Sequence, residues 1–366
     1  MHYLDYAASS PLLPAARDAL DCLGNADSGH APGRTAAARL KAARETVANA
    51  LHAHPDEIVF SSGGTESNNL AILGAARVRK KGHIITTSLD HPAVLEPVKA
   101  LTSEGFTCTV IPPGKDGRIA PEAVRDALRP DTILASCTLC CHETGAVNDI
   151  FAMASILRKV SPDTLLHTDA VQAFGRMPID VRGLGTDLLS LSGHKIGAPA
   201  GIGALYVRKN VSLAPLFHGG GQEGGLRPGT SPTELAAALA AAIPADFPTH
   251  ELKEYALSQL TTIDGIRVVP PHDAPHIVCF VMPGYPAGVL VRYLSELGVY
   301  VSAGAACGKG RRSPVLTAMG LPAAAVDSAI RVSFGFGSTR QDMDALVNGL
   351  TRAKNELSSV LRCKGH

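Results

Sequence analysis

Residues 188–209, LLSLSGHKIGAPAGIGALYVRK, contain the pattern from which the fold can be predicted. An apolar run leads into a turn with Lys195, and a second apolar run follows a glycine-rich stretch. Similar short runs occur upstream as DEIVF, GHIITTS, TCTVIPP, TILASCT and LLHTDA, and helical segments such as residues 35–53 lie between several of them. Short strands that alternate with helices predict an α/β fold, with a mostly parallel sheet and helices on both faces.

The C-terminal third of the chain has a different pattern. Two prolines in AAIPADFPTH, residues 241–250, predict a crossing between domains near Ile243. The following segments predict a small α+β domain: PHIVCFVMPG, VLVRYLSELG, VYVSAGAACG and AIRVSFG. We therefore expect a large domain over residues 14–243, and a small domain formed by residues 1–13 and 244–366.

Composition excludes several classes of protein. With 34 basic and 33 acidic residues the net charge is +1, which argues against nucleic-acid binding through bulk charge. No apolar run reaches the roughly 18 residues needed to cross a bilayer. The start, MHYLDYAASSPLLP, lacks the pattern of an export signal or transit peptide, so the eight cysteines are expected as free thiols. We expect a cytoplasmic protein that binds neither membranes nor nucleic acid directly.

Two residues suggest a covalently bound cofactor. Small residues flank Lys195, so a bulky ligand could approach an amine able to form a Schiff base, although most lysines in loops are simply exposed. Asp169 ends the apolar run LLHTDA, and the carboxyl ends of strands are where open α/β sheets bind ligands. A buried carboxylate there could pair with a protonated pyridine nitrogen, or it could cap a helix.

Two further turns are candidates for ligand binding. SSGGTESNN, residues 61–69, follows a strand-like run and precedes a helical one, which predicts either a phosphate cradle or an ordinary capped helix start. His91 precedes a proline in SLDHPAVLEP, where it could stack on an aromatic ring, take part in acid–base chemistry, or remain a solvated loop residue.

The cysteines differ in their surroundings. Cys307 lies in the glycine-flanked stretch VSAGAACGKGRRSP, with Lys309, Arg311 and Arg312 behind it, which favours a reactive thiolate. The run CTLCCHE, residues 137–143, resembles a zinc motif, but alternation along a strand would split its cysteines between two faces. No metal site is therefore expected.

Two segments near the C-terminal half remain ambiguous from the residues alone. HGGGQEGGLRPGT, residues 218–230, is too rich in glycine for a helix or strand, and predicts a functional loop or a flexible connection. Arg331, in AIRVSFG, could clamp a carboxylate ligand or pair with a structural carboxylate.

The order and spacing of these motifs resemble those of the cysteine desulfurases of the NifS/IscS type. These enzymes form part of the class V aminotransferase group of fold-type I enzymes, which use pyridoxal 5′-phosphate (PLP). The matching stretches run from YLDYAASSP through GGTESNNLAI, DHPAVLE, HETGAV, HTDAVQ, SGHKIGAPAGIGALYVRK and GGGQEGGLRPGT to SAGAAC and IRVSFG. The resemblance covers nearly the whole chain and implies a mostly parallel seven-stranded sheet.

The resemblance also implies a role for each matching residue. Lys195 would hold PLP as a Schiff base, Asp169 would pair with its ring nitrogen, Gln172 would contact its phenolic oxygen and His91 would stack on its ring. The expected phosphate ligands are Gly64, Thr65, Ser192 and His194, together with Thr230 from the neighbouring subunit of a homodimer. Arg331 would clamp the carboxylate of L-cysteine, and Cys307 would accept the sulfur as a persulfide while L-alanine leaves.

The chain departs from the family pattern at several positions. Cys141 and His142 stand where two asparagines usually precede ETG, the second of which contacts the cofactor, and we expect His142 to take that place. Tyr6 replaces a common asparagine, and Gly224 replaces a frequent arginine.

The implied function is a PLP-dependent cysteine desulfurase, which passes sulfur to an acceptor protein for iron–sulfur cluster assembly or thio-modification. Two alternatives stay open at this point. One is a PLP-dependent lyase or aminotransferase-like enzyme that does not use Cys307. The other is a weak desulfurase that depends on a partner protein.

Overall fold

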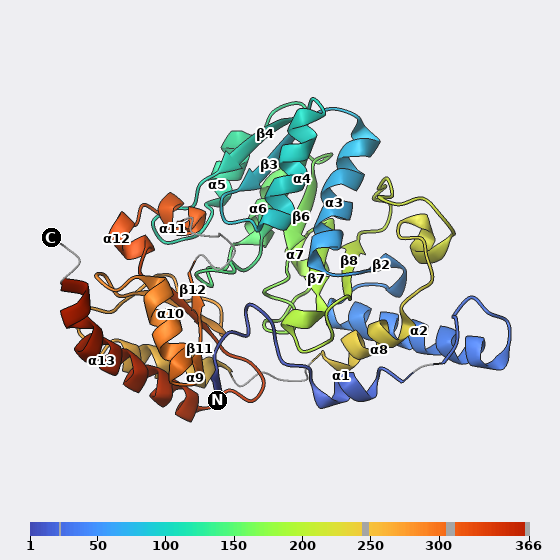
Figure 1. The fold of residues 1–366 in the computed structure, drawn as a ribbon. Coiled ribbons are helices and arrows are strands. Elements are labelled where there is room, and N and C mark those ends of the chain that lie inside the picture. Colours follow the sequence, from blue (N-terminus) through green and yellow to red (C-terminus); the bar gives the residue numbers. More distant parts are fainter. Residues whose placement is uncertain (22, 244–248, 305–311, 363–366) are drawn as a thin grey trace.

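A seven-stranded sheet forms the centre of the computed structural model, which describes residues 1–21, 23–243, 249–304 and 312–362 (Figure 1). Its strands, in spatial order, are β2 (Ile58–Ser61), β8 (Gly203–Val207), β7 (Leu188–Ser192), β6 (Leu165–Asp169), β5 (Thr132–Thr138), β3 (His83–Thr87) and β4 (Thr107–Ile111). Strand β8 is antiparallel to both of its neighbours, and the other pairs are parallel. The predicted α/β fold with a mostly parallel sheet is confirmed, and each strand falls in a predicted apolar run.

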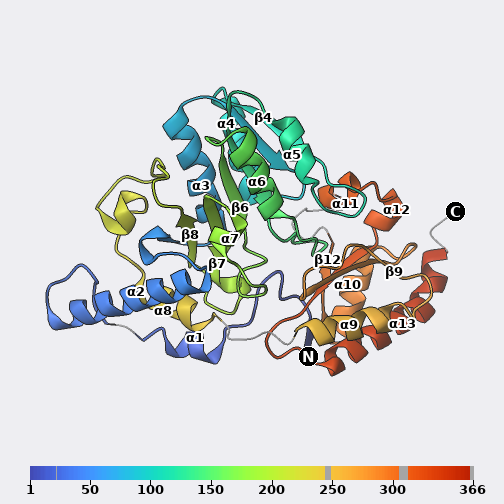
Figure 2. The ribbon, with the colours of Figure 1, turned by 180° about the vertical axis from the view of Figure 1, so that it is seen from behind.

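Helices cover both faces of this sheet, so every strand except the edge strand β4 is mostly buried (Figures 1 and 2). The apolar core on one face includes residues of α3 (Gly64–Arg79) and α4 (Pro92–Ser103). The core on the other face includes residues of α1 (Pro14–Asp18), α2 (Ala31–Ala50), α5 (Pro121–Ala127), α6 (Ile150–Val160), α7 (Val181–Leu184) and α8 (Thr233–Ala241). Among the described helices, none combines the length and apolarity that crossing a bilayer requires.

A second, antiparallel sheet lies beside the first, in the C-terminal part of the chain. Its order is β12 (Ser302–Ala303), β13 (Ala329–Ser333), β10 (Ile277–Val281) and β9 (Arg267–Val268). The helices of this part are α9 (Thr249–Leu260), α10 (Ala287–Glu296), α11 (Pro314–Ala318), α12 (Ala323–Val326) and α13 (Arg340–Arg362). The predicted crossing near Ile243 leads into residues 244–248, which lie outside the described residues, and the proposed domain limits stay a prediction.

Strand β10 attaches the small sheet to the large one. Ile277, Cys279 and Val281 belong to the core under the large sheet, whereas Val278 and Phe280 belong to a separate core with α9, α10 and α13. Successive side chains of a strand point to opposite faces, so β10 is buried on both sides. The small sheet is therefore packed firmly against the large part.

The N-terminal segment crosses between the two sheets. Strand β1 (His2–Tyr3) pairs in parallel with β11 (Val299–Tyr300), and the Leu4 carbonyl accepts the backbone N–H of Ser333. The Tyr6 hydroxyl then donates to the Phe336 carbonyl at 2.8 Å. A Cβ atom on Gly335 would lie 2.0 Å from the Tyr6 ring, so this position accepts only glycine while Tyr6 is present. These contacts place the next residues, Ala7 and Ala8, beside the carboxyl ends of the large sheet.

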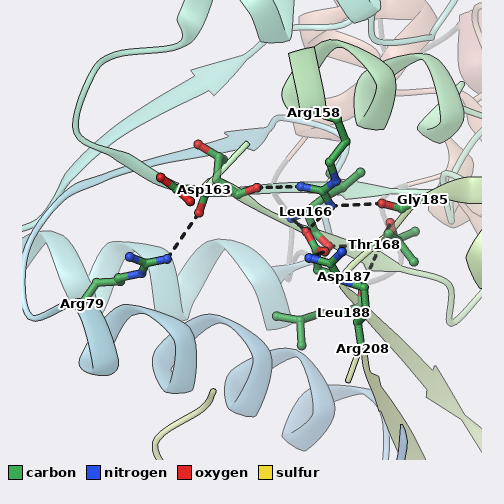
Figure 3. Close-up of polar contacts among 11 residues, drawn as sticks. Arg79, Arg158, Asp163, Leu166, Thr168, Gly185, Asp187, Leu188 and Arg208 are labelled. Atoms are coloured by element: carbon green, nitrogen blue, oxygen red, sulfur yellow. Dashed lines mark hydrogen bonds and ion pairs between the residues drawn. The ribbon is translucent and has the colours of Figure 1, made fainter. Parts of the chain in front are cut away.

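A buried charge cluster closes the opposite, amino ends of β6 and β7 (Figure 3). Asp187 is fully buried, and its carboxylate lies 2.6 Å from Arg158 and 2.6 Å from Arg208. The same carboxylate accepts the backbone N–H of Leu166 at 2.7 Å. These contacts tie α6 and the end of β8 to the two strands that lead to Asp169 and Lys195.

This cluster yields a stability prediction. Replacing both Arg158 and Arg208 with methionine leaves the Asp187 carboxylate buried without a counter-ion, so the free energy of unfolding should fall by about 3 kcal/mol or more. Urea unfolding of the protein and the double variant measures the loss. Adding Asp187→Asn removes the orphaned charge and should restore at least half of it, and a triple variant no more stable than the double would contradict the charge argument.

Candidate active site

A cavity of about 370 Å³ opens at the carboxyl ends of β5, β6 and β7. This is the edge at which open α/β sheets bind ligands. The residues around it come from both sheets, the N-terminal segment and the first turns of α3 and α4. They include Ala7, Ala8, Gly64, Thr65, Asn68, His91, Thr138, Cys140, His142, Asp169, Val171, Gln172, Ser192, His194, Lys195 and Arg331. Among the predicted site residues that the structure describes, it thus brings together all except Thr230.

Lys195 ends the short 3₁₀ turn Gly193–Lys195 that follows β7. Its Nζ donates to the carbonyl oxygens of Ala7 at 2.8 Å and Ala8 at 2.9 Å. Beside it, burial and the Lys195 charge lower the pKa of His194 to about 4, so this imidazole is neutral near pH 7. The cavity therefore contains one amine that backbone acceptors hold in place.

Asp169 is the last residue of β6 and is 4% exposed. One carboxylate oxygen accepts the backbone N–H of Val171 at 2.9 Å, and the other accepts the side-chain amide of Asn68 at 2.8 Å. Burial raises the pKa of this carboxyl, while both hydrogen bonds and the charges of His91 and Lys195 act to lower it. Asp169 therefore caps a turn, and not the helix that one interpretation of the sequence allowed, and it also lines the cavity.

The N-terminus of α3 lies at the same cavity. A Cβ atom on Gly64 would come within 2.6 Å of the Val171 side chain, so glycine allows the helix to approach the end of β6. Thr65 follows in the first turn, and Ser192 comes from the end of β7. Exposed backbone N–H groups and the helix dipole favour an anion at such a point.

Two imidazoles meet across the cavity. His91 is the N-cap of α4, and its Nδ1 accepts the backbone N–H of Ala93 at 3.1 Å. The His142 ring meets it edge to face, with ring centroids 5.3 Å apart and planes at 78°. Burial lowers the pKa of His91 and lowers that of His142 well below its ordinary value. Both shifts favour the neutral form of the imidazole.

Gln172 and Arg331 connect the cavity to the N-terminal segment. The Gln172 side chain donates to the Ala7 carbonyl at 2.9 Å. Arg331, on β13, donates to the His142 carbonyl at 2.8 Å and forms an ion pair with Asp5 at 3.0 Å. Arg331 thus already has one carboxylate partner in this structure.

The donor set fits PLP. Two cavity residues have buried polar atoms that lack a partner among the described residues: Asn68 Oδ1, an acceptor, and Arg331 Nε, a donor. The site therefore offers unmet polar groups together with an amine, a buried carboxylate and a helix N-terminus, which match the aldehyde, ring nitrogen and phosphate of that cofactor.

One predicted residue that the structure describes, Thr230, is not part of the cavity lining. Thr230 is exposed and ends a loop that a partly buried ion pair between Glu223 and Arg44, 2.6 Å apart, attaches to α2. Cys307 lies outside the described residues, as do Lys309 and Arg311.

All three thiols of the CTLCCHE run are buried. Burial raises the pKa of Cys137 and Cys140 well above the ordinary value for a thiol. Thr138, Cys140 and His142 all line the cavity, in line with the predicted alternation, although β5 itself ends at Thr138.

A fold-type I architecture, with a lysine after a central strand and a carboxylate at the end of the next, defines the class of the PLP-dependent transferases. Residues 2–346 match the family model of the class-V aminotransferases. The chain is 36% identical to "Cysteine desulfurase IscS" of Dictyoglomus turgidum over 98% of this chain and 95% of the relative. It therefore belongs to the class-V aminotransferase family and, within it, to the cysteine desulfurases, which are PLP-dependent enzymes.

Solved structures agree with this placement. The chain matches a "NifS-like protein" with a TM-score of 0.89 and 31% identity, over 96% of this chain and 99% of that one. It also matches "SspA in complex with cysteine" with a TM-score of 0.83 and 37% identity, over 91% of this chain and 99% of that one.

Some cavity residues were not predicted from the sequence. Asn68 lies one helical turn after Gly64, and this i, i+4 spacing within SSGGTESNN could have placed it on the cavity face of α3. The carbonyl groups of Ala7 and Ala8 left no such signal, because backbone acceptors are the same at every residue.

Glu143 gives a pH prediction. It accepts a hydrogen bond from Ser313, but burial outweighs this contact and the nearby Arg331, and raises the pKa of Glu143 from its ordinary 4.5 to about 7. The protonated form is favoured on folding, so the stability that this group contributes is full below about pH 4.5 and is lost as pH rises through about 7. As pH rises from about 4.5 to about 7, the free energy of unfolding of Glu143→Gln should therefore increase by about 3 kcal/mol relative to that of the parent protein.

Urea unfolding of both proteins at pH 5 and pH 8 tests this expectation. Burial also raises the pKa of Asp90 to about 7, but that effect is common to both proteins and cancels in the difference. A difference between the two proteins that is the same at both pH values would show that Glu143 does not titrate in this range.

Proposed function

We propose that this chain removes sulfur from L-cysteine with the help of PLP and leaves the sulfur as a persulfide on Cys307. The Cβ–S bond of cysteine breaks, an S–S bond to the Cys307 sulfur forms, and Cβ takes up the proton that the Cys307 thiol gives up. The products are L-alanine and the enzyme persulfide, and no outside reductant is needed. The convergence of Lys195, Asp169 and Arg331 on one cavity supports this proposal most directly.

The bound cofactor would supply an electron sink for the negative charge that develops next to Cβ. Lys195 would hold it, Asp169 would face its ring nitrogen, and Gln172 and His142 would lie towards its phenolic oxygen. The His91 ring would cover one face. The proposed phosphate ligands are Gly64, Thr65, Ser192 and His194.

Lys195 would also move protons on the substrate. Its Nζ lies between the carbonyl oxygens of Ala7 and Ala8, which orient the amine inside the cavity. Proton transfer needs a positioned amine within hydrogen-bond reach of the reacting carbon. The N-terminal segment thus supports the residue that we propose as the acid and base.

Arg331 would bind the carboxylate of L-cysteine. Guanidinium groups bind carboxylates in a bidentate manner, and Arg331 Nε has no partner among the described residues. Asp5 already pairs with Nη2 of the same group, and the His142 carbonyl accepts from Nη1, so the guanidinium is held in a fixed orientation.

Thr230 supports a homodimer. Its exposed position outside the cavity, on a loop attached by Glu223 and Arg44, suits a residue that reaches the phosphate of a second subunit. We further propose that the enzyme acts in the cytoplasm, and that an acceptor protein takes the persulfide sulfur for iron–sulfur cluster assembly or thio-modification.

Lys195→Ala tests the cofactor site. The purified protein should show a near-visible absorption band from PLP bound to Lys195, and the variant should lose this band and at least about a hundredfold of its activity. Lys209→Ala, which removes an exposed lysine beyond β8, is the matched control and should keep both. An unchanged band in Lys195→Ala would contradict the assignment of the amine.

Cys307→Ala tests the sulfur acceptor. The variant should keep the cofactor absorbance but lose persulfide formation, and alanine production from cysteine should fall to the rate without enzyme. Cys108→Ala, which removes a half-buried thiol on the edge strand, should behave like the parent protein. Alanine production that survived unchanged in Cys307→Ala would instead favour a PLP-dependent lyase.

A further inference from the structure

Asn68 is a buried amide whose side chain forms, among the described residues, a hydrogen bond with Asp169. It lies on α3, is 1% exposed and lines the cavity. Its side-chain N–H donates to a carboxylate oxygen of Asp169 at 2.8 Å, between residues 101 positions apart. Neither the composition nor the strand pattern pointed to this contact.

The orientation of the Asn68 amide follows from this bond. A carboxylate can only accept, so the nitrogen of the amide must face Asp169 and the oxygen must face away. The oxygen has no partner among the described residues, although it is buried. A buried acceptor without a partner costs free energy, so the amide is not placed here for packing alone.

The Asp169 carboxylate is held from two sides. The backbone N–H of Val171 occupies one oxygen and the Asn68 amide occupies the other. Burial favours the neutral acid and raises the pKa of Asp169, whereas hydrogen bonds to the anion oppose this effect. Val171 supplies a backbone donor that any residue with an N–H would provide, so Asn68 is the side chain that hydrogen-bonds this carboxylate among the described residues.

We propose that Asn68 is a positioning residue for the cofactor ring nitrogen, which acts by holding the Asp169 carboxylate ionised and fixed in the cavity. The proposal rests on the role given to Asp169 under the proposed function. It predicts that Asn68 affects ligands that carry the ring nitrogen and spares those that lack it. A residue that merely packed α3 against β6 would affect both kinds alike.

The test compares two ligands on the cofactor-free protein. One is PLP, and the other is its carbocyclic analogue, in which the ring nitrogen is replaced by carbon. Dissociation constants come from fluorescence or calorimetric titration, so no turnover is required. The parent protein should bind PLP more tightly than the analogue, because only PLP can donate to the buried carboxylate.

Asn68→Leu removes the amide donor but keeps a side chain of similar size. Affinity for PLP should fall roughly tenfold, as expected for the loss of a hydrogen bond to a charged group, while affinity for the analogue should change less than about twofold. Ser67→Ala is the matched control, because it removes a buried hydrogen bond to Ser61 from the preceding residue of the same helix. The ratio of the two affinities should not change in that control.

Three outcomes would overturn the proposal. Equal losses for both ligands in Asn68→Leu would show a packing role, and unchanged affinities would show no role. If the parent protein binds both ligands equally well, Asp169 does not recognise the ring nitrogen, and Asn68 cannot act through it. The Cys307 experiment does not depend on this result. If Asn68→Leu does not fold, Asn68→Ala allows the same comparison, because alanine is well tolerated inside helices.

Discussion

The Asp169 carboxylate is a buried charge, and a buried charge without partners is strongly destabilising. Its partners come from separate elements: Asn68 from α3, Lys195 from the turn after β7, and His91 from the start of α4. These groups can meet only because parallel strands place their carboxyl ends at one edge of the sheet. The strand order β7-β6-β5-β3 thus determines which side chains surround the carboxylate, and the requirement to compensate its charge links the fold to the site.

The cavity is closed by parts of the chain that are far apart in the sequence. Ala7 accepts hydrogen bonds from both Lys195 and Gln172, and Asp5 pairs with Arg331 of the small sheet. The amine and the proposed substrate clamp therefore lie on different sheets, joined by the N-terminal segment. Because β10 is buried on both faces, the two sheets are held in one relative position, and the distance between amine and guanidinium follows from that packing.

Much of this arrangement could be predicted from the sequence. Apolar runs located all the strands of the large sheet, and Asp169, a candidate functional residue expected at a strand end, is the last residue of β6. Contacts between elements could not be predicted in the same way. Periodicity shows which face of α3 Asn68 occupies, but not that Asp169 lies opposite it, and nothing in the residues near Arg331 indicates that Asp5 is its partner. Such pairs depend on tertiary packing, which local patterns do not encode.

The histidine at position 142 can be understood from its surroundings. Burial lowers the pKa of His142 well below its ordinary value, so the ring is neutral and has one N–H to donate. Its Nε2 lies 3.8 Å from Glu143, which is too far for a hydrogen bond. The rings of His142 and His91 meet edge to face. A neutral imidazole can thus donate a hydrogen bond to a cofactor oxygen as an asparagine amide would, without adding charge beside Asp169. The backbone carbonyl of His142 accepts a hydrogen bond from Arg331. Because this contact does not involve the side chain, a histidine can stand in place of the asparagine without losing it.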